Sequence, residues 1–147
     1  MDPYPSYILA FSKMIRQYKS ACSEALEEYK FSPAEIDVLM FLSNNKAYDT
    51  ARDISEFRGI SKALVSRSVD TLIRRKFIVT VIDANDHRII HLRLTDLATP
   101  IVKRLANLRE LFKREVFSGV SQTDKVVFDQ VLNTMISNSM DTSRIKD

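Results

Sequence analysis

One stretch of this chain, residues 77–94, has the composition of β-strands, whereas apolar residues elsewhere recur at helical spacing. Within it, the runs 77–82 and 89–94 are rich in β-branched and aromatic residues and flank the polar segment 83–88, which predicts a β-hairpin. The 147 residues include only two glycines and four prolines, too few to form the turns of an all-β sandwich. We therefore expect a mainly α fold with one small hairpin.

Capping residues and apolar spacing predict helices on both sides of this hairpin. From Tyr4 to Tyr29 apolar residues alternate steps of four and three, which predicts one long amphipathic helix. Ser32-Pro33-Ala34-Glu35 combines a Ser cap, Pro at the first helical position and a capping-box Glu, so a second helix begins there, with Ile36, Leu39 and Met40 facing inward. Similar signals predict the remaining helices at about 51–57, 62–75, 95 or 99 to 117, and 122 to 135 or 140.

Pro100 leaves two starts open for the helix after the hairpin. If Thr95 caps it, Pro100 lies five residues into the helix and one backbone hydrogen bond is lost. If Thr99 caps it, Pro100 occupies the first helical position, where its missing N–H costs nothing. Both starts are compatible with the sequence.

The two helices before the hairpin have the form of a helix-turn-helix. A short segment containing Gly59 separates 51–57 from 62–75, and the hairpin follows directly, which is the order of a winged helix. In the second helix the apolar residues that face the core are Val65, Val69, Leu72 and Ile73. The opposite, exposed face is therefore expected to carry Ser61, Lys62, Ala63, Leu64, Ser66 and Arg67.

Positive charge is concentrated in this winged helix-turn-helix. The whole chain has a formal charge of +3, but residues 52–93 alone contain nine Lys or Arg and five Asp or Glu, so the remainder is slightly acidic. Phosphate neutralisation by Lys and Arg supplies most non-specific DNA affinity, so we expect double-stranded DNA as a partner. For Arg74, Arg75 and Lys76, the alternative is that they end a helix, where cations favour the dipole.

Other classes of protein fit the sequence poorly. With Gly59 and Gly119 alone, no phosphate-binding G-x-x-x-x-G-K loop is possible, and the single Cys22 lies far along the chain from His87 and His91. On a strand these histidines would lie about 13 Å apart, too far for one metal ion, although a helix there would bring them together. No apolar run approaches the roughly 20 residues of a membrane span. From these motifs we expect no enzymatic activity, metal or cofactor. Because no secretory signal is visible, we expect a cytoplasmic protein.

The order of these motifs resembles the MarR family of bacterial transcription regulators. The segments that carry the resemblance are Thr50–Gly59, Ser66–Leu72, the D-x-x-D-x-R wing Asp83–Arg88, and Leu94-Thr95 ahead of a long helix. The chain departs from the family pattern at Lys76 and around Pro100, where the family often has glycine nearby. The resemblance implies one domain over residues 1–147, with a winged helix-turn-helix at 33–94 and dimerisation helices at 1–30 and 95–147.

The resemblance also implies how such a protein reads DNA. A homodimer, expected to be a repressor, would bind a pseudo-palindromic operator with helix 61–75 in the major groove and Arg88 in the minor groove. Arg67 would pair with a guanine and Leu64 would meet a thymine methyl group, while Asp86 or Asp83 would brace Arg88 or form an ordinary turn. The expected DNA-binding residues are Thr50, Arg52, Ser61, Lys62, Ala63, Leu64, Ser66, Arg67, Arg74, Arg75, Asp86 and Arg88.

Regulation and function leave alternatives open. Family members commonly release DNA on binding a small aromatic or phenolic effector, for which the candidates here are Arg16, Tyr18, Tyr29 and Arg52. Others sense oxidants through one N-terminal cysteine, but Cys22 lies on the apolar stripe, where a buried, inert thiol is favoured. The long terminal helices are expected at the dimer interface, the alternative being that they pack on their own domain. A second class is a winged-helix protein-interaction module, which would present an apolar or acidic recognition face.

Overall fold

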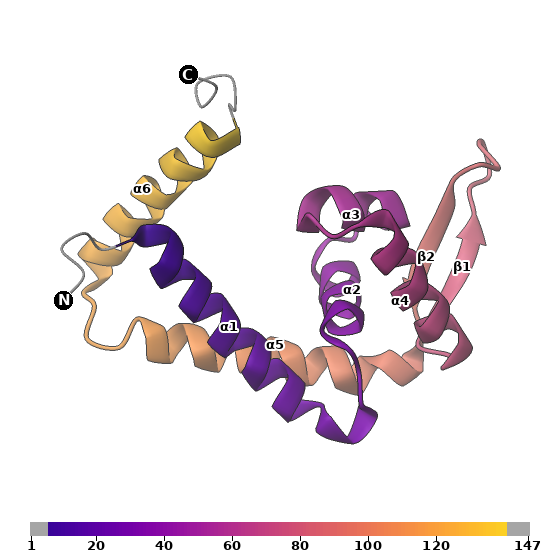
Figure 1. The fold of residues 1–147 in the computed structure, drawn as a ribbon, viewed down its shortest axis with the longest axis horizontal. Coiled ribbons are helices and arrows are strands. Elements are labelled where there is room, and N and C mark those ends of the chain that lie inside the picture. The colour runs from indigo at the N-terminus through magenta and orange to yellow at the C-terminus, as the bar shows by residue number, and fades with distance from the viewer. Residues whose placement is uncertain (1–5, 141–147) are drawn as a thin grey trace. The chain divides into compact units, whose positions relative to one another are not determined.

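The computed structural model describes residues 6–140, and the chain divides into two compact units, Met1–Glu110 and Leu111–Asp147. The expected mainly α fold with one hairpin is confirmed (Figure 1). Helix α5 begins in the first unit and ends in the second. The elements are α1 (Tyr7–Ala25), the 3-10 turn η1 (Glu27–Tyr29), α2 (Pro33–Asn44), α3 (Ala51–Arg58), α4 (Lys62–Arg74), β1 (Ile78–Ile82), β2 (Ile90–Leu94), the 3-10 turn η2 (Asp96–Ala98), α5 (Thr99–Val116) and α6 (Gln122–Met140).

The first helix is shorter than its apolar stripe predicts. Ser6 caps α1 by accepting a hydrogen bond from the Leu9 amide at 3.2 Å, and the expected start at Tyr4 lies outside the described residues. The helix ends at Ala25, and η1 follows, closed by Lys30 in the left-handed conformation with φ 53°. The stripe nevertheless continues through this break, since Leu26 is buried and Tyr29 packs against the core.

Helix α2 is buried on every side, whereas the sequence predicted one inward face. All residues from Ala34 to Leu42 are buried, because α1, α4 and β2 pack around this helix (Figure 1). Two acidic side chains are buried with it. Glu35 accepts a hydrogen bond from the Ser32 amide at 2.9 Å in the expected capping box, and Asp37 pairs with Lys19 at 3.7 Å.

The helix-turn-helix and its wing form as the sequence predicts. Thr50 and Asp53 form a capping box at the start of α3, and Gly59 ends that helix with φ 63°, a left-handed conformation that glycine adopts without strain. In α4 the core-facing residues Val65, Val69 and Leu72 are at most 6% exposed. The antiparallel strands pair from Ile78 with Leu94 to Ile82 with Ile90.

A loop residue extends the edge of this hairpin. The Leu92 amide donates a hydrogen bond to the carbonyl oxygen of Asp49 at 2.8 Å, on the side of β2 that faces away from β1. Asp49 immediately precedes the cap of α3. The wing is therefore joined to the helix-turn-helix through its backbone as well as through the chain that follows α4.

The structure combines the two starts expected near Pro100. Thr95 begins the 3-10 turn η2 but makes no side-chain cap, since its hydroxyl donates instead to the Lys76 carbonyl at 2.7 Å. Helix α5 then begins at Thr99, so Pro100 lies in the first turn, where no intrahelical partner for an N–H is needed.

Lys76 marks the departure from the family pattern at the end of α4. Its φ is 66°, in the left-handed region that glycine adopts without strain. The amide of Lys76 donates to the Ile73 carbonyl at 2.9 Å and that of Phe77 to the Leu72 carbonyl at 2.9 Å, which closes the helix. The chain therefore keeps the turn of a glycine with a lysine in its place.

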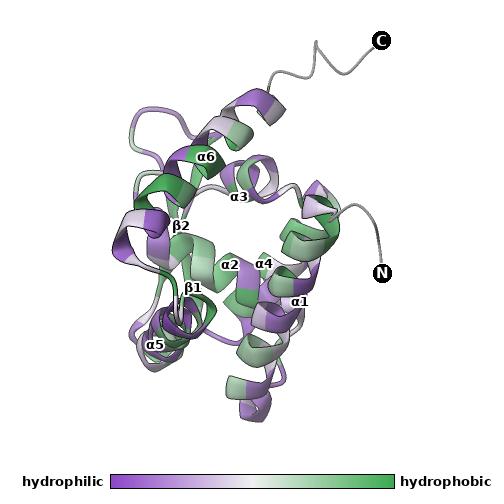
Figure 2. Cartoon of the chain, turned by 90° about the vertical axis from the view of Figure 1, so that its left-hand side faces the viewer, coloured by the Kyte–Doolittle hydropathy of each residue, from purple (hydrophilic) through white to green (hydrophobic). Residues whose placement is uncertain are grey.

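The second unit contains the end of α5 and all of α6. No residue of α6 is buried, and most of its large apolar side chains are exposed: Val126, Val127, Phe128, Val131, Met135 and Ile136. Figure 2 colours parts of this helix as hydrophobic. The clearest contact within this unit joins Phe117 and Phe128, whose rings pack edge-on with their centroids 5.7 Å apart. Between residues 6 and 140, no helix is long and apolar enough to cross a membrane.

Candidate nucleic-acid interface

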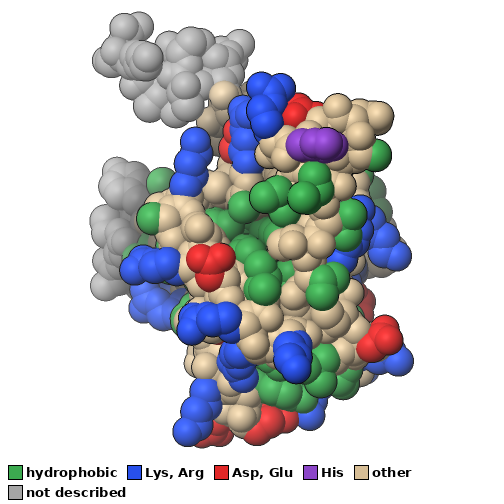
Figure 3. All heavy atoms as spheres, turned by 90° about the vertical axis from the view of Figure 1, so that its right-hand side faces the viewer, with side chains coloured by type: hydrophobic (Ala, Val, Ile, Leu, Met, Phe, Trp, Pro, Cys, Tyr) green, Lys and Arg blue, Asp and Glu red, His purple; other side chains and the backbone are tan. Residues whose placement is uncertain are grey.

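The first two turns of α4, which we call the recognition face, present polar and basic side chains to solvent. Ser61 caps the helix by accepting a hydrogen bond from the Leu64 amide at 3.2 Å. Lys62, Ala63, Ser66 and Arg67 are exposed, and Leu64 is 37% exposed. Figure 3, which views the side of the first unit that carries the wing, shows Lys and Arg side chains on both sides of a hydrophobic strip.

Three further residues expected to meet DNA lie at helix ends. Thr50 is half-buried, and its hydroxyl accepts a hydrogen bond from the Asp53 amide at 3.1 Å, so it serves as a cap. Arg52 is exposed and pairs with Glu56 at 2.9 Å. Arg74 is exposed at the end of α4 and donates to the Thr71 hydroxyl at 3.1 Å. The two arginines can turn toward a phosphate because their present partners are also at the surface.

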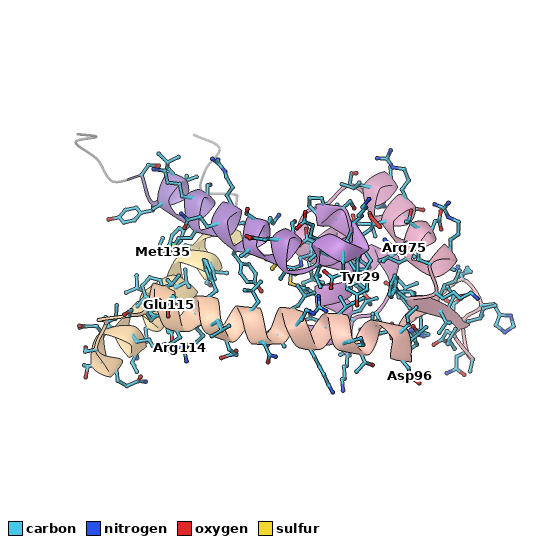
Figure 4. The ribbon with its side chains drawn as sticks, turned by 90° about the horizontal axis from the view of Figure 1, so that it is seen from below. Tyr29, Arg75, Asp96, Arg114, Glu115 and Met135 are labelled. Carbon is cyan, nitrogen blue, oxygen red and sulfur yellow. The ribbon has the colours of Figure 1, made fainter. Side chains whose placement is uncertain are left out.

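Arg75 has different surroundings from its neighbours. Its guanidinium donates to the Tyr29 carbonyl at 2.6 Å and lies over the rings of Phe31 and Phe77, with Glu35 4.0 Å away. Figure 4 shows Arg75 beside Tyr29, at the point where the first helix gives way to the second. These contacts use the arginine to join α4 to the segment before α2, so it does not belong to the recognition face.

In the wing turn, the Arg88 guanidinium makes a bidentate contact with Asp86. The Nε and Nη2 atoms of Arg88 donate to the two carboxylate oxygens of Asp86, each at 3.0 Å, while the arginine side chain remains 90% exposed. Asp83 caps the turn by accepting hydrogen bonds from the amides of Asn85 and Asp86. Asp86 is thus the brace and Asp83 the turn residue. The hydrogen bond from Arg88 holds the pKa of Asp86 below its usual value.

His91 forms a second cluster that the sequence did not reveal. Its Nδ1 lies 2.6 Å from Asp49 Oδ1 and its Nε2 lies 2.8 Å from Asp83 Oδ1, while Arg93 also bonds to Asp49. Hydrogen bonds to Asp49 and then Asp83 raise the pKa of His91. Burial opposes ionisation of Asp49, yet its bonds to His91 and Arg93 hold its pKa below the usual value. No short sequence motif could join residues so far apart.

The hairpin also decides between the two arrangements considered for the histidines. His87 lies in the wing turn and His91 in β2, so they are not on one helical face. Among residues 6–140, no group of three or more His, Cys, Asp or Glu side chains is placed to hold a metal ion.

The four candidates for effector binding have separate surroundings. Arg16 is exposed on α1, Arg52 pairs with Glu56, and the Tyr29 ring stacks on Phe31 at 5.3 Å. Tyr18 lines a hollow, together with residues of α2 and α5 that include Met40, Leu105 and Arg109. Its hydroxyl donates to the Met40 sulfur at 3.7 Å, and burial, together with the neighbouring Cys22, raises the pKa of Tyr18 to about 12.

Cys22 has the surroundings of an inert thiol. It is 1% exposed within the core of the first unit, and burial raises its pKa. The thiolate is the reactive form of cysteine, so a raised pKa lowers its reactivity at neutral pH. Of the two alternatives for Cys22, the structure favours the buried, structural one.

The sequence is similar to one family model and to known transcriptional regulators. Residues 29–89 match the model of the MarR family. The chain is 26% identical over 116 residues to YwaE, an HTH-type transcriptional regulator of Bacillus subtilis, covering 79% of this chain and 67% of that protein. It is 23% identical over 119 residues to the HTH-type regulator BilQ of Clostridioides difficile, covering 81% and 78%.

Solved structures with the same fold cover most of the chain. A MarR protein from Peptoclostridium difficile has a TM-score of 0.79 at 18% identity, covering 95% of this chain and 91% of that one. MepR of Staphylococcus aureus in complex with DNA has a TM-score of 0.75 at 19% identity, covering 90% and 96%. BpsR of Bordetella bronchiseptica, whose DNA binding 6-hydroxynicotinic acid regulates, has a TM-score of 0.67 at 19% identity, covering 90% and 96%.

Proposed function

We propose that this chain, of which residues 29–89 match the MarR family of transcription regulators, is a homodimeric repressor that binds a pseudo-palindromic operator. Its class, a DNA-binding regulator and not an enzyme, is that of the family. The operator, the repression and the dimer are the parts that we propose. The protein would act in the cytoplasm, the compartment that holds bacterial DNA.

The recognition face of α4 is the observation that carries the proposal. Its first two turns present Lys62, Ser66 and Arg67 with no apolar cover except Leu64. A helix of this kind fits the major groove, where a guanidinium pairs bidentately with guanine and an apolar side chain meets the thymine methyl group. We assign these two contacts to Arg67 and Leu64, and phosphate contacts to Lys62, Arg52 and Arg74.

The wing supports the same proposal from the other side of the site. Arg88 is almost fully exposed, yet two hydrogen bonds to Asp86 fix the plane of its guanidinium. A narrow minor groove has an enhanced negative potential that attracts arginine, and an arginine already held in place loses less conformational freedom on binding. We therefore propose that Arg88 enters the minor groove beside the half-site read by α4.

Exposed apolar side chains support the homodimer. In the first unit, Tyr7, Ile8 and Ile15 of α1 are each more than 50% exposed. In the second unit, α6 has no buried residue at all. Contiguous apolar surfaces of this kind mark interaction sites, and a two-fold dimer covers the same surface on both chains. In the dimer that we propose, the two recognition helices would lie about 34–36 Å apart, one turn of DNA.

The most specific part of the proposal is the chemical class of the effector. We propose a small aromatic acid, in line with the regulation of BpsR by 6-hydroxynicotinic acid. In this chain Tyr18 and Arg109 line one hollow of the first unit, of about 10 Å³, which a ligand of this size would have to widen to meet the hydroxyl and the cation. Arg16, Tyr29 and Arg52 have no comparable setting. Release of bound DNA by added 6-hydroxynicotinic acid or salicylate, lost in Arg109→Ala, would support this assignment.

The decisive experiment selects a binding site and then tests single residues. Duplexes selected from random DNA are titrated by fluorescence anisotropy at several salt concentrations, with Lys13→Ala on α1 as the control for loss of one charge. We expect Arg67→Ala and Arg88→Ala each to weaken binding by about 1–3 kcal/mol, and Lys62→Ala to lower the salt slope by about one. Unchanged affinity in both arginine variants would contradict the proposal, and a flat salt dependence would favour a protein-interaction module.

A further inference from the structure

One imidazole ties the wing to the helix-turn-helix. His91 on β2 bonds through Nδ1 to Asp49, in the loop between α2 and α3, and through Nε2 to Asp83, at the start of the wing turn. Asp49 is 8% exposed and stands next to the cap of α3, so its position is fixed by the core. The side chain of His91 therefore connects a rigid point of the helix-turn-helix with the segment that carries Arg88.

Both contacts exist together only while the imidazole is protonated. A carboxylate accepts hydrogen bonds, and a neutral imidazole has one N–H donor and one acceptor nitrogen. With carboxylate oxygens 2.6 and 2.8 Å from its two nitrogens, a neutral His91 would face one of them with a lone pair. The imidazolium donates to both. Loss of the proton therefore breaks one end of the connection.

The charged groups around His91 keep both carboxylates ionised. Arg93, two residues along β2, bonds to the other oxygen of Asp49, and Lys46 lines the same groove beside them. The hydrogen bond from His91 and the backbone amides of the turn hold the pKa of Asp83 below its usual value. The cross-strand partner of His91 is Val81, which carries no charge.

The connection continues from Asp83 to the DNA-facing arginine. The second oxygen of Asp83 accepts a hydrogen bond from the Asp86 amide at 2.9 Å, and Asp86 in turn holds the guanidinium of Arg88. We propose that His91 is a positioning residue for DNA binding, whose imidazolium holds the wing turn on the helix-turn-helix and so sets the direction of Arg88. This inference rests on the proposed function, in which Arg88 enters DNA.

The direction of the pH effect follows from the two acceptors. Because Asp49 and Asp83 raise the pKa of His91, the connection is complete at low pH and is lost as the pH rises through that raised value, above the ordinary pKa of about 6.5. DNA affinity should therefore fall with rising pH in this range. Arg88 would keep its charge there, because its hydrogen bond to Asp86 raises its pKa further.

The first test reads the connection without DNA. In the His87→Gln variant, His91 is the only histidine, so its titration by NMR is read without overlap. We expect a pKa above the ordinary value, and protection factors of the Asp83 and Ile89 amides, which bond within the turn, that fall as His91 loses its proton. In the double variant that adds His91→Gln, these factors should not change with pH. Equal protection below and above the His91 pKa would overturn the proposal.

The second test measures DNA binding by the same two variants, using the selected duplex and a mixed-sequence duplex at pH 6 and pH 9. We expect affinity of the His87→Gln protein to fall about tenfold at the higher pH, and that of the double variant to be weak at both, with the salt slope unchanged because no phosphate contact is lost. Thermal unfolding confirms that both variants are folded. An equal pH response in the two variants overturns the role of His91 in binding.

Failure of the proposed function gives a different pattern. If neither duplex binds the wild-type chain, the role of His91 in DNA binding falls with it. The NMR titration and the protection factors still report whether the imidazolium holds the wing. If DNA binds and responds to Arg88→Ala but not to pH, the DNA-binding proposal stands and the proposal for His91 is wrong.

Discussion

Helices α2 and α6 are both rich in apolar residues, but α2 is buried and α6 is exposed. Every residue of α2 from Ala34 to Leu42 is buried by other elements of the first unit, whereas α6 has no buried residue. The first unit thus completes its own core, and the second leaves an apolar surface uncovered. Burial of apolar surface drives both folding and association, so the same force that folds α2 within one chain is available in α6 for a second chain.

The largest expected effect tests the completeness of the α2 core. Leu39 is 0% exposed, so Leu39→Ala should lower the free energy of unfolding by about 2–5 kcal/mol through lost burial and a residual cavity. Urea denaturation followed by circular dichroism measures it. The matched control is Val131→Ala on α6, half exposed, which should cost far less in the monomer. Equal losses would mean that the two helices do not differ as described.

The next effect concerns association. Replacing Val131 and Ile136 of α6 by lysine puts two charges on the surface that we assign to the dimer, where unpaired buried charges are strongly unfavourable. We expect the variant to sediment as a 16.9 kDa monomer at micromolar concentration, while its circular dichroism keeps the helical signal of the first unit. A dimer of unchanged affinity would place the interface elsewhere. Asn107→Lys, at an exposed position four residues after Lys103 on α5, is a control for added charge.

A smaller effect on the free energy of unfolding is expected at Lys76, in the first unit. Lys76 has φ 66°, which a side chain disfavours, so Lys76→Gly should relieve strain and raise the free energy of unfolding by about 0.5–1 kcal/mol. Gly59→Ala, at φ 63° with open space around it, is the inverse control and should destabilise by strain alone. A stability loss in Lys76→Gly would show that its side chain matters more than its backbone. Dimer affinity should not change in either variant.

The smallest expected effect is at Cys22. Because the thiol is buried in the first unit and its pKa is raised, peroxide should leave operator affinity equal in the wild type and in Cys22→Ser. Mass spectrometry after peroxide treatment checks that no sulfenic acid forms. Selective oxidation with release of DNA in the wild type alone would show that the core of the first unit opens more readily than its burial suggests.

Most elements of the fold follow from local signals. Ser32, Thr50 and Ser61 each cap the helix that the sequence assigned to them, and Gly59 ends α3 as expected. These features depend on a few neighbouring residues, which is why sequence alone locates them. The break of α1 after Ala25 was missed, because Leu26 leaves helical geometry at φ −119° and no sequence pattern points to it.

The candidate site divides in the same way. The sequence placed the recognition face of α4 and the arginine of the wing, since helical period and turn chemistry decide which side chains face outward. It grouped Arg75 with Arg74, but the two differ because Phe31 and Tyr29, distant in the sequence, lie beside only one of them. Arg109 and Asp49 were missed for the same reason.

The sequence by itself determined the class of this protein, because caps, apolar periods and a wing motif in one order are local features that survive without three-dimensional information. The tertiary structure decided which polar groups meet. Asp49, Asp83 and His91 are separated along the chain, and only the packing of the loop before α3 against the outer edge of β2 brings them within hydrogen-bond distance. Such contacts depend on the whole fold, since a hydrogen bond forms only when both partners are held within about 3 Å.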